Sequence, residues 1–150
     1  MTIKTSTGLR NALLSGGSFR DTFNGLGEIR IYAGAVPQSA DASIGAATLL
    51  VTITNGVSGI GFETDAVNGI LQKSTAETWE GTVVPAAGGG MNATFYRHVL
   101  TADTDAASAT APRYQGNVAV VGADMNLTST SLVAGAVQGI DYHAVTIATA

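Results

Sequence analysis

The feature of this sequence that most constrains its fold is a series of short β-type segments that begins near residue 28. Each segment has roughly four to eight residues rich in Val, Ile, Thr or aromatic side chains, and Gly, Asn or Pro follows it. Crossover helices between parallel strands would need longer segments with an apolar repeat near 3.6 residues. The spacing therefore predicts an antiparallel β-sandwich or barrel and argues against alternating β-α-β units.

We expect eight or nine strands in a mainly β domain that spans residues 28–150, as in a jelly-roll or immunoglobulin-like sandwich. In 28–33, charged and apolar residues alternate, so Ile29 and Ile31 are expected to face inward. Sandwiches and barrels need the same alternation, so the pattern does not separate them. The predicted strands are 28–33, 47–54, 70–73, 77–81, 93–100, 114–121, 127–133 and 140–148, with 82–84 as a possible extension and 60–64 as a possible return strand.

Residues 1–27 have a different pattern and are predicted to form a short helical arm. Leu residues recur at helical spacing in 9–14 after Ser6, whose side chain can cap a helix start. Phe19 and Phe23 would lie on one face of a second short helix. Gly-rich breaks follow both segments.

Charge is distributed unevenly along the chain, which has a net charge of −4. Residues 1–30 carry two more basic than acidic side chains, whereas the remainder is acidic. This asymmetry predicts an arm that docks on an acidic neighbour. The alternative is ordinary packing of the two helices on the β domain. The candidate partner-binding residues are Leu9, Leu13, Phe19 and Phe23 as apolar contacts, with Arg10 and Arg20 facing an acidic rim.

The composition predicts a folded protein whose surface is poor in charge. Ala, Gly and Thr together fill 62 of the 150 positions, and only 12% of residues are charged, against about 25% in typical domains. The 45% hydrophobic content excludes the usual disordered class. No apolar run is long enough for a transmembrane helix, so no membrane partner is expected. On the predicted strands, small residues stand where a monomer would expose Lys and Glu, which favours a surface covered by other protein.

No pattern in the chain predicts catalysis, a cofactor or a metal. The two histidines, His98 and His143, are expected to be half-exposed strand residues, and no third ligand stands at a recognisable spacing. Asp103 and Asp105 loosely resemble the start of a calcium loop that lacks the usual Gly and Glu. We interpret 101–112 as a polar loop that contacts a partner. The scattered basic residues argue against nucleic-acid binding.

Several stretches of the chain carry a resemblance to known proteins. They are MTIKTSTGLRNALL (1–14), IRIYAGAVP (29–37), ADASIGAATLL (40–50), ATFYR (93–97) and QGNVAVVGADMNL (115–127). Together they resemble small virion structural proteins of tailed bacteriophages, in the capsid decoration (cement) and minor head protein group. The resemblance implies a non-enzymatic β-rich module on the capsid surface, often trimeric, whose partner is the major capsid protein. Such a protein is made in the cytoplasm of the host bacterium.

Two other functions remain open from the residues alone. One is a tail tube or adaptor subunit that forms a ring, in which Asn55-Gly56 would head a long hairpin that pairs with a neighbour. The other is a carbohydrate-binding or host-binding module, in which Trp79 or Tyr96 would stack on a sugar ring.

Overall fold

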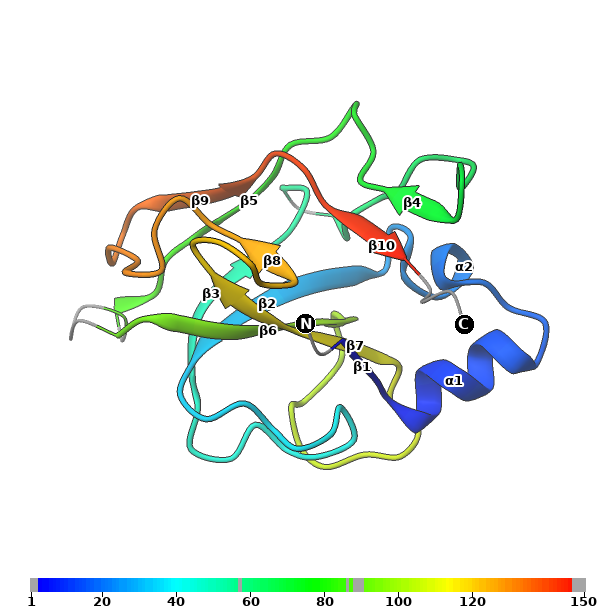
Figure 1. Ribbon diagram of the computed structural model, residues 1–150, viewed down its shortest axis with the longest axis horizontal. Helices are drawn as coiled ribbons and strands as arrows, with labels where there is room; N and C mark the ends of the chain where they lie inside the picture. Colours follow the sequence, from blue (N-terminus) through cyan, green and yellow to red (C-terminus); the bar gives the residue numbers. More distant parts are fainter. Residues whose placement is uncertain (1–2, 57, 86, 88–90, 147–150) are drawn as a thin grey trace.

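The computed structural model describes residues 3–56, 58–85, 87 and 91–146 and has a mainly β fold with two short helices (Figure 1). This confirms the predicted mainly β class, the short helices near the N-terminus and the largely antiparallel character of the sheets. The described residues form ten strands rather than eight or nine. They are β1 (Lys4–Thr5), β2 (Gly27–Ala33), β3 (Thr48–Ile53), β4 (Ile70–Gln72), β5 (Trp79–Thr82), β6 (Ala93–Leu100), β7 (Arg113–Ala119), β8 (Met125–Asn126), β9 (Val137–Ile140) and β10 (Ala144–Thr146).

The main sheet has six strands. Its order is β1-β7-β6-β2-β3. The short strand β8 also pairs with β7, further along β7 than β1 does. All of these pairs are antiparallel except β7–β8. Ile29 and Ile31 are fully buried on the apolar face, as the alternation in β2 predicts.

Two small sheets extend this main sheet around the core. One pairs β5 with β9, and the other pairs β4 with β10. Thr54, just after β3, exchanges backbone hydrogen bonds with Glu80 of β5 at 3.1 and 3.0 Å. The strands therefore follow the order β8, β7, β6, β2, β3, β5, β9 around the apolar core, and β9 comes to face β8.

Three predicted strands differ from the structure. The possible return strand at 60–64 forms only isolated bridges, from Ile60 to Gly27 and from Phe62 to Lys73. The prediction of a strand at 127–133 is wrong: β8 lies just before it, and Ser131 makes an isolated bridge to Asn92. Ser129 Oγ accepts a hydrogen bond from the Ser131 backbone N–H at 3.2 Å, a local bond that competes with a strand ladder. The predicted strand 140–148 is divided between β9 and β10, and its last residues lie outside the described part of the chain.

The predicted arm is joined to the rest of the molecule. The helices α1 (Thr7–Leu14) and α2 (Phe19–Phe23) follow β1, which pairs with β7 of the main sheet. Ser6 caps α1 as predicted, because its Oγ accepts a hydrogen bond from Leu9 N at 3.1 Å. Neither of these helices has the length or the apolar content needed to cross a bilayer.

The second face of the main sheet is polar and yet buried. Arg30, Arg97 and Gln115 form one row across β2, β6 and β7, and each is at most 9% exposed. Arg97 donates to Gln115 Oε1 at 2.8 Å and to the Ala42 carbonyl at 2.7 Å. Backbone carbonyls of the 34–47 and 101–112 loops accept further bonds from this layer, so both loops lie against it.

Candidate partner-binding surface

Two of the six candidate arm residues lie inside the core. Leu9 and Phe23 are 0% exposed and belong to the same hydrophobic cluster as the strand residues. As the chain is folded, neither side chain has surface to offer a partner. Packing of the helices on the β domain, the alternative that the sequence left open, describes both residues.

The other four candidates lie nearer the surface. Leu13 and Phe19 are half-buried and pack against the core, and Phe19 meets the Tyr114 ring edge-on at 5.4 Å. Arg20 is half-buried and donates from Nε to the Glu63 carbonyl at 3.0 Å. Arg10 is exposed, and its Nη2 donates to Thr7 on its own helix at 2.9 Å. Of the six residues, only Arg10 is fully available at the surface.

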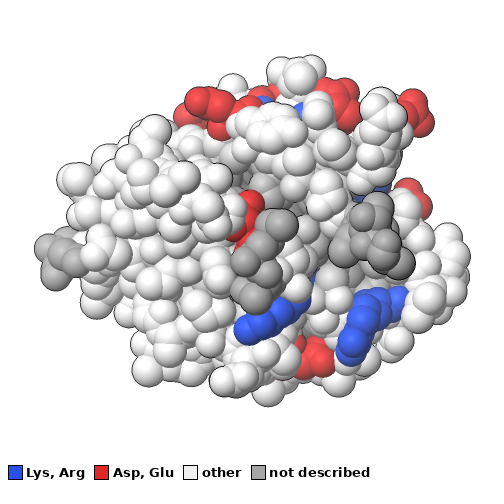
Figure 2. Space-filling model, viewed as in Figure 1, with Lys and Arg blue, Asp and Glu red and all other residues white. Residues whose placement is uncertain are grey.

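A different surface stands out for its lack of charge. The stretches 81–96, 114–123 and 125–140 contain no Asp, Glu, Lys or Arg. The structure brings much of them to one end of the molecule, where Ala93 N bonds to Thr130 O and Val83 N bonds to Ala136 O. Figure 2 shows this end on the left as an area without red or blue. We call the described residues of 83–94, 117–123 and 128–137 the uncharged end.

The uncharged end exposes large apolar side chains. Val121 is 83% exposed, and a shallow hollow connects the adjacent β7–β8 loop to Val36. Single exposed apolar residues are ordinary, but a group of them on one surface without charges is typical of an interface. The exposed members are Met91, Val120, Val121, Val133 and Val137, with Val36 beside them.

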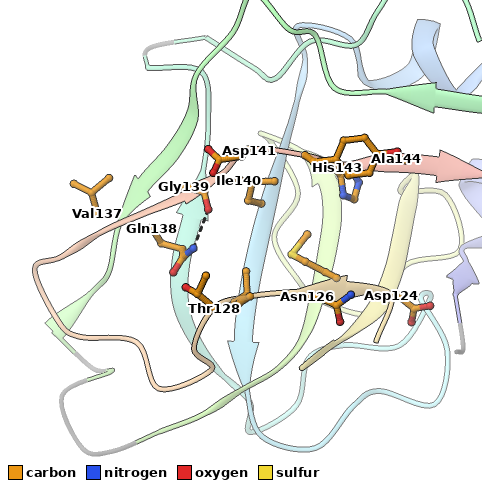
Figure 3. Close-up of a pocket in the computed structure, with 13 residues that line it drawn as sticks. Asp124, Asn126, Thr128, Val137, Gln138, Gly139, Ile140, Asp141, His143 and Ala144 are labelled. Atoms are coloured by element: carbon orange, nitrogen blue, oxygen red, sulfur yellow. Dashed lines mark hydrogen bonds between the residues drawn. The ribbon is translucent and has the colours of Figure 1, made fainter. Parts of the chain in front are cut away.

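A groove of about 620 Å³ borders the uncharged end (Figure 3). One bank is 124–128, which contains β8, and the other is 137–144, which contains β9. The backbone N–H and C=O of Glu80 form hydrogen bonds with Thr54, on the side of β5 that faces away from β9. Hydrogen bonding alternates along an antiparallel pair, so the residues next to Glu80 in β5 are the ones that bond to β9. By this alternation, the backbone N–H and C=O of Gly139 point away from β5, toward the groove. The groove therefore lies between the edge of the main sheet at β8 and the free edge of β9 in the small sheet.

The groove carries polar side chains but no arrangement typical of catalysis. Asn126, Thr128, Gln138 and Asp141 line it, and Gln138 Nε2 donates to the Gly139 carbonyl at 2.8 Å. In the described part of the chain, no three His, Asp or Glu side chains stand close enough together to hold a metal ion.

The aspartates of the candidate calcium loop are engaged elsewhere. Asp103 accepts two hydrogen bonds from Arg113, at 2.7 and 2.9 Å. Asp105 accepts from Arg30 at 3.0 Å and from the Tyr32 hydroxyl at 2.8 Å. Both carboxylates therefore hold the 101–112 loop on the polar face of the sheet, instead of facing solvent as a cation site would.

The structure contradicts the expected exposure of the two histidines and of the two candidate sugar-stacking rings. His98 and His143 are 0% and 5% exposed, so the expectation of half-exposed strand histidines is wrong. Trp79 and Tyr96 are each 1% exposed, so neither ring is available to stack on a sugar. Alternation marks which side chains share a strand face, but it does not show which faces other elements cover.

The hairpin expected for a tail tube subunit also differs. Asn55 pairs with Ser58, and Ile60 then bridges to Gly27 of β2. Within the described residues, the chain after β3 turns back at once and forms no long hairpin.

Comparisons of the chain with protein-family models, with curated proteins and with solved structures found no match.

Proposed function

We propose that this chain is a virion structural protein of a tailed bacteriophage that binds the outside of the assembled capsid and stabilises it, without enzymatic activity. The observation that carries the proposal is the uncharged end with its exposed valines. The resemblance of five sequence stretches to capsid decoration and minor head proteins also supports it. We further propose that the main sheet and the two small sheets form the layers of a β-sandwich.

Such a protein stabilises the capsid because its binding is thermodynamically coupled to capsid assembly. A ligand that binds the assembled shell and not the separate subunits adds its binding free energy to the stability of the shell. A surface without Lys or Glu suits this role, because burial of long charged side chains costs desolvation and side-chain entropy. Val121 and Val133 can be covered without that cost. The partner on this proposal is the major capsid protein, and the chain itself associates as a homo-oligomer, in the related group often a trimer.

Fractionation of virions tests the location. Purified particles are separated into heads and tails, and this chain is quantified in each fraction by mass spectrometry. The proposal expects a fixed ratio to the major capsid protein in heads. Recovery from tails alone would transfer the chain to the tail class, and absence from both fractions would overturn a structural role.

A pair of matched variants tests the surface. Val121→Lys places a charge on the uncharged end, whereas Val67→Lys places one on a valine of similar exposure beside the β4 turn. We expect Val121→Lys to weaken co-sedimentation with capsids at least tenfold and Val67→Lys to leave it unchanged, with equal thermal stability in both. Equal binding by the two variants would contradict the assignment of the uncharged end.

The proposed contact between the arm and the capsid is tested by a substitution at the surface of the arm, because deletion of the arm would disturb the core. Removal of 2–25 would take Leu9 and Phe23 out of the core and unfold the protein for reasons unrelated to binding. Arg10→Glu reverses the one fully exposed charge among the arm candidates. Reduced capsid binding by this variant would support an arm contact, and unchanged binding would argue that the arm only packs on the β domain.

A further inference from the structure

Two histidines lie side by side in the centre of the apolar core. His98 comes from the middle of β6 and is 0% exposed, and His143 lies between β9 and β10 and is 5% exposed. Their ring centroids are 6.4 Å apart. His143 also lines the inner part of the groove between β8 and β9, so a solvent-accessible space adjoins this buried pair (Figure 3).

The rings around the pair are aromatic. His98 contacts Phe23 at 4.4 Å between centroids and Phe62 at 5.4 Å. His143 contacts Trp79 and Tyr96, each at 5.9 Å. These side chains come from α2, from the segment before β4, and from β5 and β6. The pair therefore joins the main sheet to the elements that cover its apolar face.

The imidazoles lack the partners that normally stabilise a charged form. Both ring nitrogens of His98 and Nε2 of His143 are buried without a hydrogen-bond partner among the residues that the structure describes. A neutral imidazole tolerates this environment at a modest cost, whereas an imidazolium without a counterion does not. At neutral pH the core is therefore built for two uncharged rings.

The groups that face the pair from each neighbouring element offer no compensating charge. From α2 and 60–62 the contacts are phenylalanines, and from β6 the contact is Tyr96. Tyr114 of β7 lies opposite His98 in the sheet register, and burial raises the phenol pKa of both tyrosines.

Charged side chains do stand one layer further out. From the β4–β5 region, Glu77 accepts a hydrogen bond from Trp79 Nε1, and Lys73 lies over the Trp79 ring. Asp124 acts on Tyr96 from the end of the groove, and Asp141 is exposed on the segment that carries His143. None of these groups offsets the effect of burial on the histidines. Burial lowers the pKa of His98 well below its usual range, with a further contribution from His143, and burial lowers the pKa of His143 to about 4.

We propose that His143 is an acid-sensitive latch: its protonation releases the 141–146 segment, including β10, from the core into the adjoining groove, while the main sheet stays folded. The segment is suited to this movement. β10 pairs with β4 over three residue pairs and with no other strand of the described chain, and the groove provides a path to solvent. Outside the core, the imidazolium is hydrated and has Asp141 beside it on the same segment.

The main sheet is expected to survive this opening because other interactions hold it. Its strands pair over longer ladders, and the buried arginines Arg30 and Arg113 bind carboxylates on its polar face. Among these carboxylates, burial acts to raise the pKa of Asp103, but the hydrogen bonds from Arg113 and the Asp105 backbone and the charges of Arg113 and Arg30 together hold that pKa below its usual value. Asp103 thus stays ionised under conditions that already protonate a histidine.

Hydrogen exchange tests the latch. Amide protection is compared at pH 7.5 and pH 4.5 after correction for intrinsic exchange rates. We take the pKa of His143 as ordinary in the open state and about 4 in the closed state. The equilibrium constant for opening should then rise roughly fiftyfold to a hundredfold as the pH falls from 7.5 to 4.5. We expect a loss of protection of that size in 141–146 and in its partner strand β4, with β2 and β6 unchanged. Loss of protection in all four strands together would overturn the proposal.

Two variants separate the histidines. His143→Phe keeps an aromatic ring without a titratable group, so the 141–146 segment should stay protected at pH 4.5. His98→Phe leaves His143 in place, so the segment should still open. The opposite result, in which only His98→Phe abolishes opening, would overturn the assignment to His143.

A spectroscopic measurement on the unaltered protein keeps the test decisive if a variant fails to fold. The imidazole resonances of His143 should titrate below pH 5, together with the amide signals of 141–146. Trp79 is the single tryptophan of the chain, and its emission should change over the same pH range. Titration of His143 near its ordinary pKa without a change in 141–146 would contradict the latch.

Discussion

Asp103 and Arg113 form the most buried of the ion pairs among the described residues, with side chains 2% and 1% exposed. The pair fixes the 101–112 loop on the polar face of the sheet, and Arg113 adds a bond to the Ala106 carbonyl at 2.7 Å. At this scale, a polar side chain stabilises the fold only because its partner is also in place.

Replacement of Asp103 by Ala leaves the Arg113 guanidinium buried without its carboxylate. We expect a loss of about 3–5 kcal/mol in the free energy of unfolding, measured by urea denaturation. Asp65→Ala, at an exposed position, is the matched control and should change stability by less than about 0.5 kcal/mol. A small effect of Asp103→Ala would mean that the loop does not depend on this pair.

Gly8 shows how tertiary contact reverses a local preference. Helix propensity alone predicts that Gly8→Ala in α1 stabilises the protein by about 1 kcal/mol. A Cβ at this position would lie 2.2 Å from the Thr110 carbonyl oxygen, so the helix and the loop would have to separate. We expect a lower melting temperature for Gly8→Ala and a slightly higher one for Asn11→Ala, at an exposed position of the same helix. Stabilisation by both substitutions would contradict the close contact.

At the scale of elements, two serines perform the same capping role in different surroundings. Ser18 Oγ is exposed and caps α2 through Asp21 N at 2.9 Å. Ser6 Oγ caps α1, donates to the Ala111 carbonyl at 2.8 Å and accepts from Arg113 N at 2.8 Å, while Ser6 is 1% exposed. One hydroxyl thus joins a helix start to the edge of the main sheet.

Loss of the Ser6 hydroxyl should lower the free energy of unfolding more than loss of the Ser18 hydroxyl. Ser18→Ala should destabilise by about 1 kcal/mol, the ordinary cost of a lost cap. Ser6→Ala also leaves the buried Arg113 N–H and Ala111 carbonyl without this partner, so we expect about 3 kcal/mol. Chemical denaturation of the two variants measures the difference, and equal costs would show that burial of Ser6 adds nothing.

The helices and strands that the sequence predicts correctly are those that depend on residues close together in the chain. The cap at Ser6, the helix 19–23 and the strand 93–100 all agree with the sequence prediction. Each depends on neighbours within a few residues. The strand expected at 127–133 failed because apolar and β-branched residues favour a strand only where a partner strand is available.

At the scale of the whole molecule, the buried histidines make stability depend on pH. Well above pH 7, His143 is neutral in both the folded and the unfolded chain, so it adds no pH dependence to the stability. Below that, the unfolded chain binds a proton near its ordinary pKa of 6.5, while the folded chain does so only near 4. The unfolded state therefore binds more protons in this interval, and stability falls as pH falls.

The size of this loss follows from the shift in pKa. From pH 7 to pH 4, His143 should lower the free energy of unfolding by about 3 kcal/mol, measured by denaturation at several pH values. His143→Phe should make the curve shallower over this range, and the remaining slope should include the contribution of the buried His98. A wild-type curve that is flat between pH 7 and pH 5 would contradict the buried, unpaired state of the ring.

The mainly β class, the helix cap at Ser6, the inward position of Ile29 and Ile31, and the scarcity of charge all follow from the sequence alone. All of these follow from local periodicity, capping chemistry and composition. Only the tertiary structure decided that Arg30, Arg97, His98 and the arm residues Leu9 and Phe23 are buried. The physical reason is that periodicity groups side chains on a face, whereas burial depends on distant segments that cover the face. The same limit applies to the uncharged end, because stretches without charge become a surface only where the fold brings them together.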